Sequence, residues 1–312
     1  MKTQLLKLLA IIMGAALLCS EAFASSTMIS VQHFKELEQK VKEPGTKDFS
    51  NTLVVMDDDD TLTMMSCPDQ TGTNTCQYLG GPAWFSWQKG LAKGSPYRVA
   101  NSFEDLLKIG TLLFAINDMV YTEHDVPTVL NSLTESKARL LVLTARGPGN
   151  SSATARQFAD LPVAGLKHMN FLELISHNSL IGNKSQINSI AGPYQPCNDS
   201  KDRPVSYQQG IMYVAGQNKG EMLKCLLDST ESSFIKHIFF IDDTLKNVED
   251  VYDAFEDSKK YEVVAIHYLA LKDHKNALTK GPMAKIYQDN AKSRWNKIKK
   301  TLGSELQDPA LP

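Results

Sequence analysis

LVVMDDDDTL, residues 53–62, is the stretch that decides the fold: four apolar residues run directly into four aspartates and a threonine. A short apolar run bounded by polar residues predicts a buried strand of a parallel sheet. Packing does not explain four successive carboxylates, because like charges this close repel and raise one another's pKa. In open α/β sheets, ligands bind beyond the carboxyl ends of the strands. We therefore expect a site built around a hard metal ion here, rather than a solvated acidic turn.

A calcium-binding loop of the EF-hand type does not fit this stretch. Such a loop needs a glycine at its sixth position and a glutamate at its twelfth. Counted from Asp57, those two positions hold Leu62 and Pro68. The acidic run therefore belongs to a different kind of metal site.

Length and composition indicate an ordinary globular protein. The chain has 312 residues, 42% of them hydrophobic and 22% charged, which suits one large α/β domain with an insertion or two domains. The formal net charge of −2 gives no sign of a nucleic-acid or membrane-surface partner. We therefore expect no nucleic-acid binding.

The amino-terminal residues have the pattern of a secretory signal. Lys2 and Lys7 precede an apolar run over residues 8–18, and the motif Ala-Phe-Ala follows at 22–24. A basic region, a short apolar core and an A-x-A site are typical of a signal peptide, here residues 1–24. The apolar run is too short for a transmembrane span. We expect the rest of the chain to be exported, to the periplasm or beyond the cell, without a membrane span.

Four cysteines follow the predicted signal peptide: Cys67, Cys76, Cys197 and Cys225. An even number in an oxidising compartment favours disulfides, and the first two bracket a Gly/Thr/Asn-rich loop that a bond between them would close. Free cysteines are the alternative, and the pairing stays open. Zinc is not expected, because the sequence has no CxxC pair and no histidine at ligand spacing.

Strands that alternate with helices predict a mostly parallel sheet. We expect buried strands at 53–56, 138–143, 211–214, 235–241 and 261–268. We expect helices at 30–41, 84–87, 102–117, 126–133, 151–159, 219–227, 247–255 and 282–302. The stretch 161–209 contains several prolines and glycines, and we expect an irregular insertion that leaves the core.

Three later polar signals also stand at or just beyond apolar strands. Thr144 ends the second strand, Lys219 begins the helix after the third, and Asp242-Asp243 ends the fourth. Each has an ordinary explanation by itself, as a helix cap or a solvated surface lysine. Together, in this order, they predict a hydroxyl, an ammonium and two carboxylates at the same edge of the sheet as the first acidic run.

In these residues the sequence resembles the haloacid-dehalogenase-like phosphohydrolase superfamily. Its four motifs are matched by Asp57-x-Asp59-x-Thr61, Thr144, Lys219 and Asp242-Asp243. The resemblance covers the core of residues 25–312, though not the insertions. It implies a Rossmann-like parallel sheet with helices on both faces and a small, mainly helical cap. Exported members of the superfamily include bacterial periplasmic acid phosphatases.

The resemblance also implies roles for these residues. Asp57 would attack phosphorus to form an aspartyl-phosphate, and Asp59 would protonate the leaving oxygen and then activate water. Thr144 would donate to a phosphate oxygen, and Lys219 would neutralise the phosphate and keep the nucleophile ionised.

A magnesium site follows from the same resemblance. Asp57, the backbone carbonyl of Asp59 and the carboxylate of Asp242 would hold Mg²⁺, with Asp243 either behind them or as the direct ligand in place of Asp242.

Four neighbours of these motifs keep alternative roles. We interpret Asp58 as a structural residue behind the site and Asp60 as a turn residue. Arg146 would either reach the substrate or form a surface ion pair. Asn247 would either orient the metal site or cap a helix.

The gaps between the motifs leave room for a cap. Thr61–Thr144 and Thr144–Lys219 both exceed the length of a plain βα connection, and we place a helical cap at about 80–120. Trp84, Phe85 and Trp87 would line its entrance and stack on an aromatic leaving group, or simply pack the cap onto the core.

We therefore expect an exported Mg²⁺-dependent phosphomonoesterase acting on a small phosphorylated molecule. The alternatives are a phosphotransferase, and a non-catalytic or host-interaction protein on the same scaffold.

Overall fold

The computed structural model describes residues 26–43, 45, 47–66, 77–163, 165, 169–180, 190–194, 203–230 and 232–305. The predicted signal peptide, Cys67, Cys76 and Cys197 lie outside these ranges. Within them, Cys225 is the single cysteine, and it is disulfide-bonded. No helix in these ranges is both long and apolar enough to cross a membrane.

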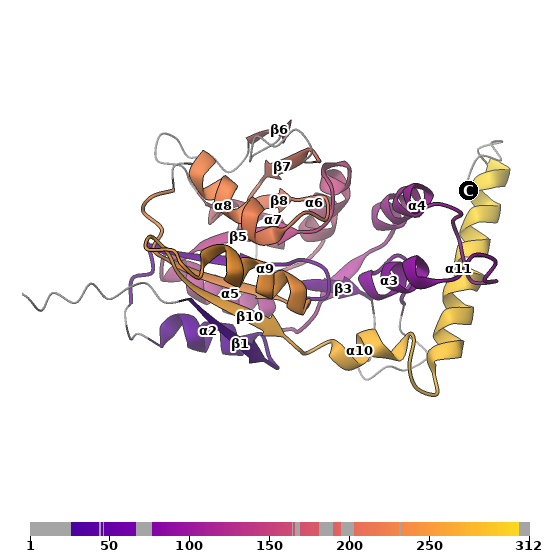
Figure 1. Ribbon diagram of the computed structural model, residues 1–312, viewed down its shortest axis with the longest axis horizontal. Coiled ribbons are helices and arrows are strands. Elements are labelled where there is room, and N and C mark those ends of the chain that lie inside the picture. The colour runs from indigo at the N-terminus through magenta and orange to yellow at the C-terminus, as the bar shows by residue number, and fades with distance from the viewer. Residues whose placement is uncertain are drawn as a thin grey trace, which may run out of the picture.

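An eight-stranded sheet forms the centre of the molecule, with strand order β1-β10-β9-β2-β5-β8-β7-β6 (Figure 1). In that order the strands are Thr27–Val31, Glu262–Tyr268, His237–Asp242, Thr52–Met56, Arg139–Thr144, Ile211–Tyr213, Val205–Gln208 and Ile190–Tyr194. The pairs from β1 to β8 are parallel, whereas β7 and β6 are added antiparallel at one edge. The acidic strand β2 therefore lies between β9 and β5, and the carboxyl ends of all three meet.

Two hydrophobic clusters cover opposite faces of the sheet. Alternate side chains of β2 enter them: Val54 and Met56 belong to one cluster, Leu53 and Val55 to the other. This burial on both faces explains the continuous apolar run in the sequence. The predicted α/β fold with helices on both faces is confirmed.

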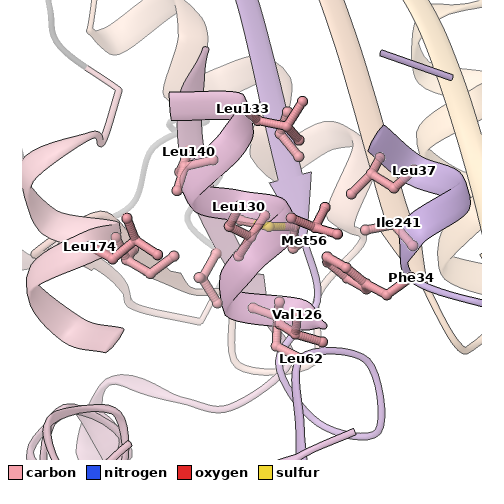
Figure 2. Packing of buried hydrophobic residues seen from close by; sticks show 14 of the residues in the cluster. Phe34, Leu37, Met56, Leu62, Val126, Leu130, Leu133, Leu140, Leu174 and Ile241 are labelled. Carbon is pink, nitrogen blue, oxygen red and sulfur yellow. The ribbon is translucent and has the colours of Figure 1, made fainter. Parts of the chain in front are cut away.

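The helices divide between these clusters. The first face is covered by α2 (Lys35–Lys42), α5 (Val126–Glu135), α6 (Ser151–Ala159) and α7 (Phe171–His177). The second is covered by α8 (Lys219–Ser229) and α9 (Leu245–Phe255). Figure 2 shows the first cluster, with Leu130 of α5 against Met56 of β2 and Leu37 of α2 nearby.

A helical subdomain lies beside the sheet (Figure 1). The chain leaves the core through β3 (Thr63–Met65), forms α3 (Pro82–Gly90) and α4 (Phe103–Ile116), and returns through β4 (Met119–Tyr121), which pairs antiparallel with β3. These two helices occupy the position predicted for the cap at about 80–120.

The C-terminal helices complete this subdomain. Helices α10 (Lys272–Ala277) and α11 (Ala284–Glu305) follow the last sheet strand, and α11 packs on α3 and α4 in a third hydrophobic cluster. Trp84 and Tyr287 are buried there, each 1% exposed. We name this unit, made of β3, α3, α4, β4, α10 and α11, the cap.

Two predictions about the fold are wrong. The helix predicted over 30–41 begins only at Lys35, because Thr27–Val31 forms an edge strand on β10. The region 161–209 does not leave the core in its described part: α7 is packed on the first face of the sheet, and β6 and β7 extend the sheet itself. The sequence contained a signal for α7, since Asn170 and Glu173 form a capping box at its start.

Candidate active site

The four aspartates lie on a tight turn at the carboxyl end of β2. The carbonyl oxygen of Asp58 accepts hydrogen bonds from the backbone N–H groups of Thr61, Leu62 and Thr63, at 3.2, 2.9 and 2.9 Å. Asp60 has a φ of +62°, in the left-handed region that non-glycine residues seldom adopt. The turn thus coils the chain once after the strand, so that Thr63 pairs in parallel with Asp59, and keeps all four carboxyl groups near the sheet edge.

Lys219 joins two of the predicted site residues. Its ammonium contacts Asp57 Oδ1 and lies 2.7 Å from Asp242 Oδ2, while its side chain is only 1% exposed. Burial lowers the pKa of this lysine, but the two carboxylates raise it more, so that its net pKa is above the ordinary value. Lys219 is therefore a charged bridge between the ends of β2 and β9.

Gly220 allows this lysine to enter the site. A Cβ atom at Gly220 would lie 2.1 Å from the backbone oxygen of Asp250 and 2.7 Å from Cβ of Ala254, both in α9. Only glycine permits the two helices to approach this closely. The first turn of α8, with Lys219, is thereby held against the core.

Asp57, Asp242 and Asp243 can hold one cation. Each offers an oxygen, and these three atoms lie within 4.8 Å of one another. Asn247 donates its amide to both oxygens of Asp242, at 3.1 and 3.0 Å, which fixes the orientation of that carboxylate. Of the two roles considered for Asn247, these contacts favour the orienting one. Both members of the predicted acidic pair belong to the group.

Lys275 is a cation in the site that the sequence analysis missed. It lies on α10, within the cap, and its ammonium contacts Asp243 Oδ2. Its neighbour His274 stacks on Tyr78 with ring centroids 4.7 Å apart, and burial lowers the pKa of that imidazole to about 4. Neutral His274 thus holds α10 against Tyr78, within the cap. No sequence motif marked Lys275, because tertiary packing alone brings it here.

The site carries more acidic than basic groups. We call Asp57, Asp58, Asp59, Asp60, Asp242 and Asp243 the carboxylate cluster. Within the described residues its cationic contacts are Arg146, Lys219 and Lys275, so six acidic groups meet three cations.

The excess of acidic groups affects their titration. Burial raises the pKa of both Asp57 and Asp58 to about 7, although Lys219 and Arg146 oppose the increase. Burial together with neighbouring carboxylates also raises the pKa values of Asp60, Asp242 and Asp243. A divalent cation would relieve this repulsion, so the residues present fit a bound metal ion.

Thr144 lies where the sequence predicted, at the end of β5 beside β2, and is fully buried. Its hydroxyl oxygen accepts the backbone N–H of Arg146 at 3.2 Å. Among the described residues, no acceptor for the hydroxyl proton is found, which leaves that proton available to a bound ligand.

Arg146 is buried and binds the acidic turn directly. Its Nε and Nη2 atoms donate to the two oxygens of Asp59, at 2.8 and 2.7 Å, and Nη1 lies 3.1 Å from Asp58 Oδ2. Its side chain is 2% exposed. Arg146 therefore forms a buried ion pair with the acidic turn, and neither a surface ion pair nor a substrate contact describes it.

The cap tryptophans have packing roles in this structure. Trp84 is buried in the third hydrophobic cluster, and the ring of Trp87 lies 5.6 Å from that of Tyr97. Phe85 packs edge-on against Phe103 at 6.1 Å. Of the two interpretations of Trp84, Phe85 and Trp87, these contacts favour packing within the cap.

The comparisons place the chain in a family without assigning its chemistry. The model of the family described as "Protein of unknown function (DUF2608)" matches residues 30–308, and the chain belongs to that family. No curated protein matches the chain at significant similarity.

Proposed function

We propose that this protein is a Mg²⁺-dependent phosphomonoesterase of the haloacid-dehalogenase-like kind, which acts through an aspartyl-phosphate. The observation that carries the proposal is the position of Lys219. One buried ammonium contacts Asp57 and Asp242, and both carboxylates belong to a trio close enough to share a cation. An ammonium and a metal beside one carboxylate are what a phosphate nucleophile requires.

Asp57 is the proposed nucleophile. Thr61 donates to its Oδ2 at 3.3 Å, and Lys219 contacts its Oδ1. One carboxylate oxygen would form a bond to phosphorus as the bond between phosphorus and the leaving oxygen breaks. Lys219 would offset charge on the phosphoryl oxygens, and the Thr144 hydroxyl would donate to one of them.

Asp59 is the proposed acid and base. It is the second residue after Asp57, and its side chain is 15% exposed, so it borders the space open to solvent. Asp59 would give its proton to the leaving oxygen. It would then take a proton from the water that attacks phosphorus, which releases inorganic phosphate and restores Asp57.

Asp57, Asp242 and Asp243 would hold the metal, with Asn247 orienting one of these carboxylates. Oxygen ligands suit a small hard cation such as Mg²⁺. When bound, the ion supplies positive charge that stabilises the transferring phosphoryl group. The same charge offsets the repulsion within the carboxylate cluster.

Hydrolysis of para-nitrophenyl phosphate tests the proposal. The chain without residues 1–24 is assayed with Mg²⁺ and with EDTA, beside Asp57→Asn. Asp48→Asn is the matched control, because Asp48 is an exposed residue that pairs with Lys137.

We expect the wild type and the control to hydrolyse the ester only when Mg²⁺ is present. We expect the rate of Asp57→Asn to be lower by at least roughly 10³-fold. Absence of metal-dependent turnover by the folded wild type over a broad pH range would contradict the proposal.

We also propose that residues 1–24 direct export and are removed. This rests on the basic, apolar and A-x-A pattern of that stretch. Expression of the full chain in a bacterium, followed by fractionation and mass measurement, tests it. A periplasmic or secreted product that begins at Ser25 is expected, and an uncleaved cytoplasmic product would contradict it.

A further inference from the structure

We propose that Arg146 is a positioning residue: it fixes the carboxylate of Asp59 and connects it, through Gln157, to helix α4 of the cap. The inference rests on the proposed function, because that function makes Asp59 the acid that protonates the leaving group. The four motifs supply Asp59 but do not specify how its carboxylate is oriented.

The contact between Arg146 and Asp59 defines a single orientation. Two parallel N–H···O bonds, at 2.8 and 2.7 Å, join the planar guanidinium to both carboxylate oxygens. Such a forked pair restrains the carboxylate in plane and in angle, which one ammonium could not do. Asp59 is therefore held by a rigid partner as well as by its backbone.

The third nitrogen of Arg146, Nη1, points into the protein. Nη1 donates to Thr154 Oγ1 at 2.8 Å and to Gln157 Oε1 at 2.9 Å, both on α6. These contacts and its burial remove the guanidinium from solvent. Arg146 would therefore act on the reaction through Asp59 and would not touch the substrate.

Gln157 carries the connection onward to the cap. While its Oε1 accepts from Arg146, its Nε2 donates to the backbone oxygens of Phe114 and Asn117, at 2.8 and 3.0 Å, where α4 ends. The ring of Phe114 also lies over the guanidinium, 4.4 Å from Cζ to the ring centroid. The end of α4 thus contacts Arg146 by two routes.

A precise orientation matters most for the acid step. A general acid must lie within hydrogen-bond reach of the leaving oxygen, and a misplacement of about 1 Å can cost about 10²-fold in rate. A nitrophenolate departs without a proton, whereas an alkoxide needs one. Disturbing Asp59 should therefore slow hydrolysis of an alkyl phosphate far more than that of para-nitrophenyl phosphate.

The test compares these two esters by kcat/KM, which reports the steps up to departure of the leaving group. Arg146→Lys keeps the charge but cannot form the fork. We expect its kcat/KM for glycerol phosphate to fall by roughly 10²-fold, and that for the nitrophenyl ester by less than about tenfold. Circular dichroism and thermal unfolding with Mg²⁺ establish that the variant is folded.

Gln157→Leu is the second variant, and it leaves the arginine in place. We expect the same selective loss for the alkyl ester, at roughly tenfold. Arg156→Gln is its matched control, because Arg156 also donates to the backbone oxygen of Asn117, at 2.8 Å, from an exposed position on the same helix. If Gln157 acts through Arg146, the control should keep both activities.

The outcomes separate this inference from the proposed function. A wild type that hydrolyses neither ester with Mg²⁺ would refute both. An active wild type whose folded Arg146→Lys variant loses both esters equally, or loses neither, would overturn the inference and leave the phosphatase proposal standing. If Arg146→Lys does not fold, the comparison of Gln157→Leu with Arg156→Gln tests the inference instead. Equal changes of kcat/KM in these two variants would overturn the connection to α4.

Discussion

Asp57→Asn should abolish turnover and, without metal, make the protein progressively more stable relative to the wild type as the pH rises. The carboxyl group is buried among other carboxylates, and burial raises its pKa to about 7 from an ordinary value of 3.8. The folded wild type therefore binds a proton at this group more tightly than the unfolded chain does. The amide of the variant has nearly the same shape and does not titrate.

The sign and size follow from this difference in pKa. Below pH 3.8 the group is protonated in both states, and its full contribution to stability is present. As the pH rises, the unfolded chain loses the proton first, and stability falls until the pH passes about 7. At 1.36 kcal/mol per pKa unit, the part lost between pH 5 and pH 7 is about 2 kcal/mol. Removing the Asp57 charge also lowers the pKa values of Asp58, Asp60 and Asp243, and this change adds to the difference with the same sign.

Urea unfolding in EDTA at pH 5 and at pH 7 measures the effect. The quantity is the unfolding free energy of Asp57→Asn minus that of the wild type, and it should increase by about 2 kcal/mol between these pH values. Asp48→Asn is the control, because a hydrogen bond from Lys137 holds the pKa of this exposed carboxyl below its usual range, so that it stays ionised from pH 5 to pH 7. A difference that stays constant, or that decreases toward pH 7 with unchanged m-values, would refute the assignment of a strained, buried carboxylate at Asp57.

Three further predictions concern the groups that support the site. Gly220→Ala places a Cβ 2.1 Å from a backbone oxygen of α9, so it should lower the unfolding free energy by about 1–3 kcal/mol and also lower turnover. Gly303→Ala is the control, because no atom lies within 4 Å of its added Cβ, and it should not lower the unfolding free energy in the same urea titration. Asn247→Leu removes an amide that orients a metal-binding carboxylate and should weaken Mg²⁺ binding by about 10–100-fold in calorimetry; unchanged affinity would contradict the orienting role. Lys275→Met removes a cation that contacts Asp243 and should tighten Mg²⁺ binding, so weaker binding in the same measurement would contradict that expectation.

The sheet and most of the candidate site were predictable from sequence. Strands β2, β5 and β9 are buried on both faces, so each appears as a continuous apolar run, and polar residues follow at its carboxyl end. Parallel neighbours bring those ends together by geometry alone. This is why Asp57, Thr144 and Asp242 could be expected at one edge before any contact was known.

The edge elements were less predictable, because their sequences carry weaker patterns. Strand β1 is mostly exposed and joins the sheet at its edge, through β10. Its residues also continue the apolar spacing that predicted the following helix, so the strand was missed. The sequence in and around β6 and β7 contains several prolines and glycines, which suggested an irregular insertion. They belong to the sheet because β7 pairs with β8 and β6 pairs with β7, and this pairing is a tertiary event.

The sequence by itself therefore determined the central strands, the helices that follow them, and the chemical identity of the carboxylates, the hydroxyl and the bridging lysine. Only the tertiary structure decided which cations balance them. Arg146 reaches Asp59 from 87 residues away, and Lys275 reaches Asp243 from a helix that belongs to the cap. The physical reason is that local periodicity reports which side of an element is buried, whereas contacts between distant side chains depend on how whole elements pack.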